Sequence, residues 1–215
     1  DWFEKGDLTR LADEMIASGR MPEAILVVPN GEGPGLLGRS LYIDSYDESV
    51  RMERFLTVDL LRWMDSSFRT ERHPNRRAVV GISDGGTGAF NLVLRHPDLF
   101  HACASLSGTF RLEKEIGMGG VIGPDPVGSR ILDEASPALA VRRARPHHGI
   151  VMAFNCGLDD DQLDDNRAFH LELQALRIAH TYHEYPGGHD WNYWTAHVPE
   201  ALEAVTAKMK VAGGK

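Results

Sequence analysis

The residues with the clearest chemical potential lie in one short motif, Gly81-Ile82-Ser83-Asp84-Gly85, which has the form G-x-S-x-G. It follows the apolar run 78–80 and precedes a helical pattern over about 87–95. A nucleophile on such a sharp strand-to-helix turn needs small neighbours, and the glycines provide them. The motif predicts that Ser83 is a nucleophile, presented above the edge of a sheet. A glycine-rich turn without catalytic function is the alternative interpretation.

The start of the helix after this motif suits a developing negative charge. A helix N-terminus carries backbone N–H groups without a partner and the positive end of the helix dipole. The N–H of Asp84 is therefore the candidate oxyanion-hole donor.

A lone serine hydroxyl is a weak nucleophile, so catalysis requires a histidine base and a carboxylate, in the chain order Ser, acid, His. Three acids, Asp159, Asp160 and Asp161, follow the apolar run 150–154. His189 follows the short run 181–185 at a glycine turn, and it is the predicted general base.

Metal binding is the alternative role for histidines in this sequence. The sequence holds ten histidines. As a zinc set, His180, His183 and His189 lack fixed helical spacing and a carboxylate partner. We therefore expect no metal, and the predicted chemistry requires no cofactor.

Short apolar runs alternate with helical patterns along the chain. The runs are 24–28, 78–80, 102–106 and 150–154, which are typical of strands buried on both faces. Spacings of three and four place apolar residues on one helix face at Leu8, Leu11 and Met15, at Met52, Leu56, Leu60 and Trp63, at Phe169, Leu173 and Leu176, and at Val198, Leu202, Val205 and Met209. This alternation predicts the α/β class, with a mostly parallel sheet covered by helices on both faces. Ligands bind outside the carboxyl ends of such strands.

The composition excludes several classes of protein. The chain has 215 residues, 42% of them hydrophobic, which is enough for one domain with a sizeable core and excludes intrinsic disorder. A net charge of −8 with scattered basic residues argues against nucleic acid. No apolar run approaches the roughly 18 residues of a membrane span. We expect a soluble protein, cytoplasmic or secreted, with Cys103 and Cys156 as buried thiols.

One region interrupts the alternation. Residues 109–147 are rich in Gly and Pro and predict an irregular, cap-like excursion from a single domain over 1–215. We assign substrate selection to this excursion and to the 30–45 loop, with Asn30, Tyr42, Phe110 and Trp191 as candidate substrate-binding residues. Simple packing is the alternative role for each of the aromatic residues.

Over nearly its whole length the sequence resembles the esterase D or "putative esterase" family of α/β-hydrolases, which includes feruloyl esterases, S-formylglutathione hydrolases, siderophore esterases and mycolyltransferases. The matching segments are Val27–Gly31, Ser40–Ser45, Gly81–Gly86, Arg95–Phe100, Leu106–Gly108, Cys156–Asp160 and Gly187–Trp191. The resemblance implies an α/β-hydrolase fold and a serine esterase acting on a small-molecule ester through an acyl-enzyme. An acyltransferase or thioesterase on the same triad, or a non-catalytic scaffold, is the alternative.

The resemblance also distinguishes among the acids. The family pattern C-G-T-x-D falls on Cys156–Asp160 and implies Asp160 as the triad acid, with Asp159 second. Asp161, Asp164 and Asp165 are then interpreted as charges that favour the N-terminus of the next helix.

Two departures from the family pattern carry expectations of their own. Asp84 stands where relatives usually have Met, which places a carboxylate beside the candidate oxyanion hole unless it pairs with a cation. Family members also have two or three strands before the position of Asp1, one of which ends in a turn that gives a second oxyanion donor. Two expectations follow: either the chain is an N-terminally truncated hydrolase, or the loop around Trp2 or the 29–31 loop supplies that donor. The sheet edge that the absent strands would leave exposed favours a homodimer, in which a second subunit covers it.

Overall fold

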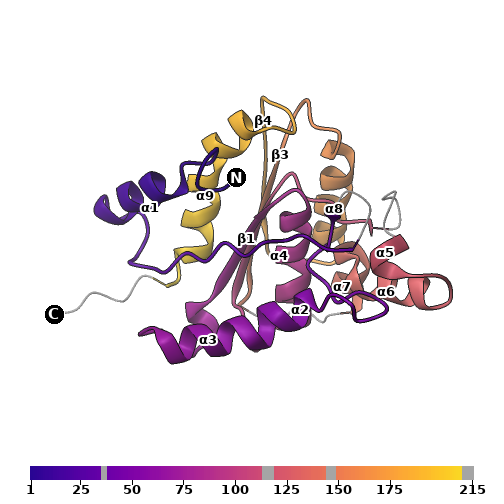
Figure 1. The fold of residues 1–215 in the computed structure, drawn as a ribbon. Helices are drawn as coiled ribbons and strands as arrows, with labels where there is room; N and C mark the ends of the chain where they lie inside the picture. The colour runs from indigo at the N-terminus through magenta and orange to yellow at the C-terminus, as the bar shows by residue number, and fades with distance from the viewer. Residues whose placement is uncertain (35–37, 113–118, 144–148, 210–215) are drawn as a thin grey trace.

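The computed structural model describes residues 1–34, 38–112, 119–143 and 149–209, in which helices and strands alternate over most of the length (Figure 1). In chain order the elements are α1 (Leu8–Ala17), α2 (Met52–Arg54), the π-helical turn η2 (Phe55–Asp59), α3 (Leu60–Ser67), the 3₁₀ turn η3 (Pro74–Arg76), β1 (Ala78–Ile82), α4 (Asp84–Arg95), β2 (Ala102–Leu106), α5 (Gly119–Ile122), α6 (Val127–Ala135), α7 (Pro137–Arg143), β3 (Val151–Gly157), α8 (Leu163–Ala175), β4 (Thr181–Tyr185) and α9 (Trp191–Thr206).

Within the described residues the strands form one parallel sheet in the order β1-β2-β3-β4. In the register, Ala102 lies between Ala78 and Val151, and Ala153 pairs with Thr181. Because each connection between parallel strands crosses back over the sheet, the carboxyl ends of all these strands meet at one edge. The loops that follow β1, β3 and β4 are therefore neighbours.

Two helical layers cover the sheet, and the side chains of each strand alternate between them. In β2, Ala102, Ala104 and Leu106 pack with residues of α1 and α9, whereas Cys103 packs with residues of α4, α7 and α8. Figure 1 shows α1 and α9 on one side of the strands and α4 and α8 on the other. The predicted α/β architecture is confirmed.

Four phenylalanines fill the core between the sheet and the helices α4 and α8. Phe90, Phe110, Phe154 and Phe169 are all buried, and their ring centroids lie 4.1 to 5.8 Å apart. Most of the pairs meet edge to face, an arrangement that aromatic quadrupoles favour. This cluster fixes two helices: α4, which begins just after Ser83, and α8, which begins just after the loop of Asp159, Asp160 and Asp161, called the acid loop below.

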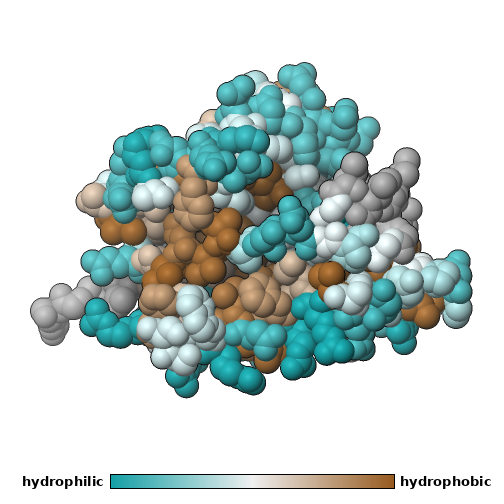
Figure 2. All heavy atoms as spheres, in the orientation of Figure 1, coloured by the Kyte–Doolittle hydropathy of each residue, from teal (hydrophilic) through white to brown (hydrophobic). Residues whose placement is uncertain are grey.

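The prediction of a strand over residues 24–28 is wrong. The segment forms no strand, and its side chains alternate: Ile25 and Val27 are 51% and 42% exposed, whereas Leu26 and Val28 pack against the core on the α1 and α9 side. An apolar run predicts burial on both faces, but this segment is packed on one side only. Figure 2 shows apolar atoms gathered on this face of the molecule, where the segment crosses β1 in Figure 1.

The other predicted elements are confirmed, with small differences. Strands occupy the predicted runs at 78–80, 102–106, 150–154 and 181–185, and helices occupy each of the predicted helical patterns. Trp63 and Leu176, expected on buried helix faces, are 55% and 42% exposed, and Met209 lies beyond the end of α9.

The excursion predicted over 109–147 holds α5, α6 and α7 in its described part, while its residues 113–118 and 144–147 lie outside the described ranges. Across the helices that the structure describes, none is both long enough and apolar enough to cross a membrane.

Replacing Phe169 with alanine tests the aromatic cluster. We expect Phe169→Ala to lower the free energy of unfolding by about 3–5 kcal/mol, because it removes a fully buried ring and leaves a cavity. The matched control is Leu171→Ala on the same helix, where the side chain is 62% exposed, and its effect should stay within about 0.5 kcal/mol. Urea unfolding measures both changes, and equal losses in the two variants would contradict the packing described above.

Candidate active site

Ser83 lies on the turn between β1 and α4 in a strained backbone conformation. Its φ is 54° and its ψ is −122°, a region that costs a residue with a side chain of order 1–3 kcal/mol. Two hydrogen bonds hold the turn: Ser83 N donates to Leu106 O at 2.9 Å, and Thr87 N donates to Ser83 O at 3.1 Å. The pairing with β2 thus maintains the conformation that presents the Ser83 hydroxyl.

The glycines around Ser83 allow α4 to lie close to the sheet. A Cβ atom on Gly81 would lie 1.9 Å from the carbonyl oxygen of Gly85, and one on Gly86 would lie 2.2 Å from Ser105 Oγ. A side chain at either position would push α4 away from β1 and β2. Gly81 and Gly86 are therefore required by the contact between strand and helix, whereas a Cβ atom on Gly85, the second glycine of the motif, would lie 3.6 Å from the Tyr42 hydroxyl, which is an ordinary contact.

His189 lies in the short loop between β4 and α9. The next residue, Asp190, caps α9, because its Oδ1 accepts a hydrogen bond from Asn192 N at 2.8 Å. Earlier in the loop, the carbonyl of Gly187 accepts a hydrogen bond from Asp159 N at 2.9 Å. The loop that carries His189 is thereby attached both to its own helix and to the acid loop after β3.

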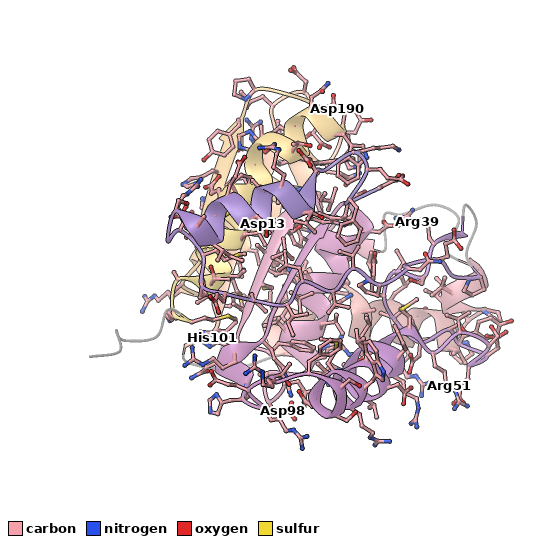
Figure 3. All side chains as sticks on the ribbon, turned by 60° about the vertical axis from the view of Figure 1, so that its left-hand side comes forward. Asp13, Arg39, Arg51, Asp98, His101 and Asp190 are labelled. Atoms are coloured by element: carbon pink, nitrogen blue, oxygen red, sulfur yellow. The ribbon has the colours of Figure 1, made fainter. Side chains whose placement is uncertain are left out.

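The structure brings Ser83, Asp160 and His189 together. His189 Nε2 lies 2.9 Å from Ser83 Oγ, and His189 Nδ1 lies 3.1 and 3.0 Å from Oδ1 and Oδ2 of Asp160. Asp160 is buried, whereas Asp159 is exposed. In Figure 3 Asp190, the neighbour of His189, lies at one end of the molecule, and His101, which precedes β2, lies toward the other.

The Asp160 carboxylate is held in its ionised form. Burial disfavours the charge, but hydrogen bonds from His189, from the Ser107 hydroxyl and from Gln162 N outweigh it and keep the pKa of Asp160 below its usual value. An ionised carboxylate at Nδ1 favours the imidazole tautomer with a proton on that nitrogen. The lone pair of Nε2 then faces the Ser83 hydroxyl, which is the arrangement a general base needs.

Ser107 and Trp194 complete the surroundings of Asp160 and His189, although neither residue carries a role predicted from the sequence. Trp194 Nε1 donates to Ser107 Oγ at 3.1 Å, and the Trp194 ring meets the His189 ring edge to face with centroids 4.9 Å apart. Ser107 was within reach of prediction, because it directly follows β2 at the carboxyl edge of the sheet. Trp194 has no comparable local signal.

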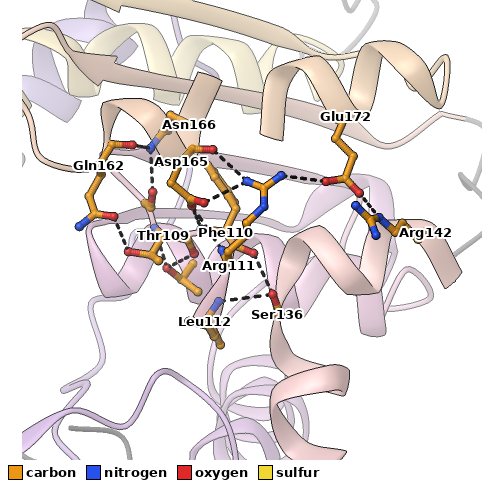
Figure 4. A network of polar contacts seen from close by, with 12 residues as sticks. Thr109, Phe110, Arg111, Leu112, Ser136, Arg142, Gln162, Asp165, Asn166 and Glu172 are labelled. Atoms are coloured by element: carbon orange, nitrogen blue, oxygen red, sulfur yellow. Dashed lines mark hydrogen bonds and ion pairs between the residues drawn. The ribbon is translucent and has the colours of Figure 1, made fainter. Parts of the chain in front are cut away.

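A polar network fixes the beginning of α8 beside the acid loop (Figure 4). Asp165 accepts a hydrogen bond from Phe110 N at 2.5 Å and forms an ion pair with Arg111 at 3.0 Å. Thr109 Oγ1 donates to the side chain of Gln162 at 3.0 Å, and Gln162 N in turn donates to the Asp160 carboxylate at 2.8 Å. The acid is thus linked to the segment that follows β2. Asp164 and Asp165 lie in the first turn of α8, as predicted.

Two of the four candidate substrate-binding residues lie close to the triad. Tyr42 packs over the first turns of α4, where Cβ atoms on Gly85 and Gly88 would lie 3.6 and 2.7 Å from it. Trp191 packs edge to face against Trp194, whose ring contacts His189.

The other two candidates make their contacts with residues outside the triad. Phe110 is fully buried and stacks on Phe169 at 4.1 Å, so the prediction that it lines a substrate pocket is wrong. Its ring joins the core because the polar network holds its backbone beside α8. Asn30 is exposed, and its amide exchanges hydrogen bonds with Glu32 in its own loop, at 3.2 and 3.1 Å.

Asp84 forms an ion pair with Arg39 of the 30–45 loop. Arg39 Nε lies 2.7 Å from Asp84 Oδ2, and Arg39 Nη2 makes a second contact with Asp84 Oδ1. The alternative in which Asp84 pairs with a cation is confirmed. Asp84 is also the first residue of α4, so its N–H belongs to the N-terminal turn of that helix.

Comparison with known proteins places the chain in a family. A family model described as "Putative esterase" matches residues 1–205. The chain belongs to this esterase family. Esterase Rv1288 of Mycobacterium tuberculosis (strain ATCC 25618 / H37Rv) is 26% identical over 190 residues, which cover 77% of this chain and 41% of that protein. The acetyl esterase of Caldicellulosiruptor saccharolyticus is 23% identical over 192 residues, which cover 82% and 69%. The chain thus spans less than half the length of the mycobacterial relative.

Solved structures agree with this membership. A ferulic acid esterase superimposes with a TM-score of 0.80 at 26% identity, covering 96% of this chain and 79% of that one. An S-formylglutathione hydrolase from Agrobacterium tumefaciens has the same fold, with a TM-score of 0.75 at 19% identity and coverages of 97% and 79%. The resemblance inferred from the sequence and the α/β-hydrolase fold are confirmed.

A separate cavity of about 390 Å³ lies away from Ser83, Asp160 and His189, and its lining includes Glu53, Arg95 and His96. Glu53 contacts Arg95 at 3.0 Å and His96 at 2.6 Å, which connects α2 to the end of α4. None of the triad residues lines this cavity. Over the described ranges, no group of three or more His, Cys, Asp and Glu side chains is placed to hold a metal ion.

The two cysteines provide a test of the core around the site. Cys103 and Cys156 are fully buried, and burial raises the pKa of each thiol above its usual value. Because the thiolate is the reactive species, we expect no reaction with a disulfide reagent at pH 8 in the native protein. Both thiols should react once guanidinium has unfolded the chain. Rapid modification of either thiol in the native protein would contradict this packing.

Proposed function

We propose that this chain is a serine carboxylic-ester hydrolase that acts through an acyl-enzyme on a small or aromatic acyl ester. The observation that carries the proposal is the line of hydrogen bonds from Asp160 through His189 to Ser83, with contacts of 2.9 to 3.1 Å. Membership of the esterase family supports carboxylic ester hydrolysis as the class of reaction.

Ser83 is the nucleophile in this mechanism. Its Oγ attacks the ester carbonyl while His189 Nε2 takes the hydroxyl proton, and Asp160 stabilises the imidazolium that forms. Collapse of the tetrahedral intermediate transfers the proton from His189 to the departing alcohol and leaves an ester bond between Ser83 and the acyl group. Water activated by His189 then hydrolyses this bond and restores Ser83. The sequence of steps uses only these side chains and water.

The oxyanion is assigned to the first turn of α4. Asp84 N lies one residue beyond the nucleophile, at the positive end of a 12-residue helix. A backbone N–H there is a suitable donor to a charge that develops on the carbonyl oxygen. Tyr42, which packs over this turn, and Trp191, on the side of His189, are the side chains we assign to the acyl pocket.

Removing the nucleophile is the direct test of the proposal. We expect Ser83→Ala to lower kcat for p-nitrophenyl acetate and butyrate by about 1000-fold or more, because the acyl-enzyme can no longer form. Labelling by a fluorophosphonate probe should be lost as well. The matched control is Ser66→Ala, which removes an exposed hydroxyl at the end of α3 and should retain both properties. Equal background hydrolysis by the wild type and Ser83→Ala would refute the proposal in favour of a non-catalytic scaffold.

The neighbouring acids Asp160 and Asp159 give a second test. We expect Asp160→Asn to lower kcat by about 10³- to 10⁴-fold, because an amide no longer favours the required tautomer and does not stabilise the imidazolium. Asp159→Asn makes the same chemical change at an exposed side chain, and kcat should remain within about 2-fold of the wild type. Steady-state kinetics on the two variants measures the difference. A larger loss of kcat in Asp159→Asn than in Asp160→Asn would instead assign Asp159 as the triad acid.

A further inference from the structure

The residue after the nucleophile presents an electrostatic conflict. Asp84 offers its backbone N–H at the start of α4, but it also carries a carboxylate in that same turn. A carboxylate stabilises a helix N-terminus through the dipole. The same negative charge opposes a nearby oxyanion, and in a partly desolvated site the repulsion is larger than in water.

Arg39 is placed to cancel that charge. Its Nε and Nη2 contact the two different carboxylate oxygens of Asp84, with 2.7 Å for the Nε contact, so the planar guanidinium binds the carboxylate through two parallel bonds. The side chains of Arg39 and Asp84 are 20% and 29% exposed, so the pair is shielded from solvent more than a surface ion pair.

The backbone around Arg39 holds the guanidinium in this position. Arg39 pairs with Glu32 in an isolated antiparallel bridge, and Ser40 Oγ donates to Gly31 O at 2.6 Å. The adjoining Tyr42 has a positive φ of 57° and lies against the glycines of α4. Its hydroxyl has a raised pKa because of burial and, in addition, the nearby charge of Asp84. The loop and the first turn of α4 therefore form one packed unit around the ion pair.

We propose that Arg39 is a positioning residue of the esterase reaction, which acts by neutralising the Asp84 carboxylate so that the first turn of α4 presents its N–H to the oxyanion without an opposing charge. The inference rests on the proposed function, because it concerns the same reaction. It assigns a role to a loop residue that lies 45 positions from Asp84 in the chain.

A double-mutant cycle separates this electrostatic role from a structural one. The variants are Arg39→Gln, Asp84→Asn and the double variant, assayed with p-nitrophenyl acetate at low ionic strength. We expect Arg39→Gln to lower kcat by about 10-fold with KM within about 2-fold, the scale of one uncompensated charge near a reacting anion. Adding Asp84→Asn should recover most of the lost kcat, although the double variant lacks the ion pair. Raising the salt concentration to about 1 M should reduce the deficit of Arg39→Gln, because salt screens the exposed charge.

The controls distinguish the ways in which the idea can fail. Arg77 and Asp65 form another partly buried ion pair, with 2.6 Å between Arg77 Nη2 and Asp65 Oδ2, and Arg77 precedes β1 at the end of the sheet away from Ser83. Arg77→Gln should leave kcat within about 2-fold of the wild type, and circular dichroism checks that every variant is folded.

A double variant as impaired as Arg39→Gln, or an Arg39→Gln variant with wild-type kcat, would overturn the role of Arg39 while leaving the esterase assignment in place. A wild-type chain without Ser83-dependent hydrolysis would overturn the proposed function, and this inference with it.

Discussion

The buried carboxylate of Asp160 sets the requirement that the rest of the site meets. A carboxylate withdrawn from water is tolerated only where hydrogen bonds replace its hydration, and each bond here comes from a different part of the chain. Ser107 follows β2, Gln162 lies in the turn before α8, and His189 follows β4. The hydrogen bonds to this one carboxylate therefore fix three loops relative to one another. They also orient the His189 imidazole toward Ser83.

Ser83, the proposed nucleophile, depends on the same sheet for a different reason. The positive φ of Ser83 is unfavourable in an isolated chain, and the hydrogen bond from Ser83 N to Leu106 O holds it in place. Gly81 and Gly86 let α4 approach closely enough for that turn to close. The strained backbone of Ser83 and the buried carboxylate of Asp160 are thus both held in place by the parallel pairing of β1, β2 and β3. The aromatic core beneath α4 and α8 keeps that pairing rigid.

The sequence predicted the parts of the site whose signals are local. Ser83 and His189 follow from a short motif and a glycine turn after apolar runs, whereas the choice of Asp160 over Asp159 depended on family resemblance. Arg39 and Trp194 could not be predicted, because their partners are set by packing between segments far apart in the chain. The errors have a related origin: the run 24–28 and Phe110 were interpreted from their apolar character, but a hydrophobic residue does not reveal which neighbours will cover it.

The order of the elements along the chain has a consequence for the newly made protein. Ser83 and His189 are 106 residues apart in the sequence, and His189 is held by β4 and α9, which come last among the described elements. During translation, Ser83 is therefore synthesised before His189. Until the final strand joins the parallel sheet, Ser83 has no imidazole beside it, so under the proposed mechanism a nascent chain that lacks β4 and α9 carries no activated serine.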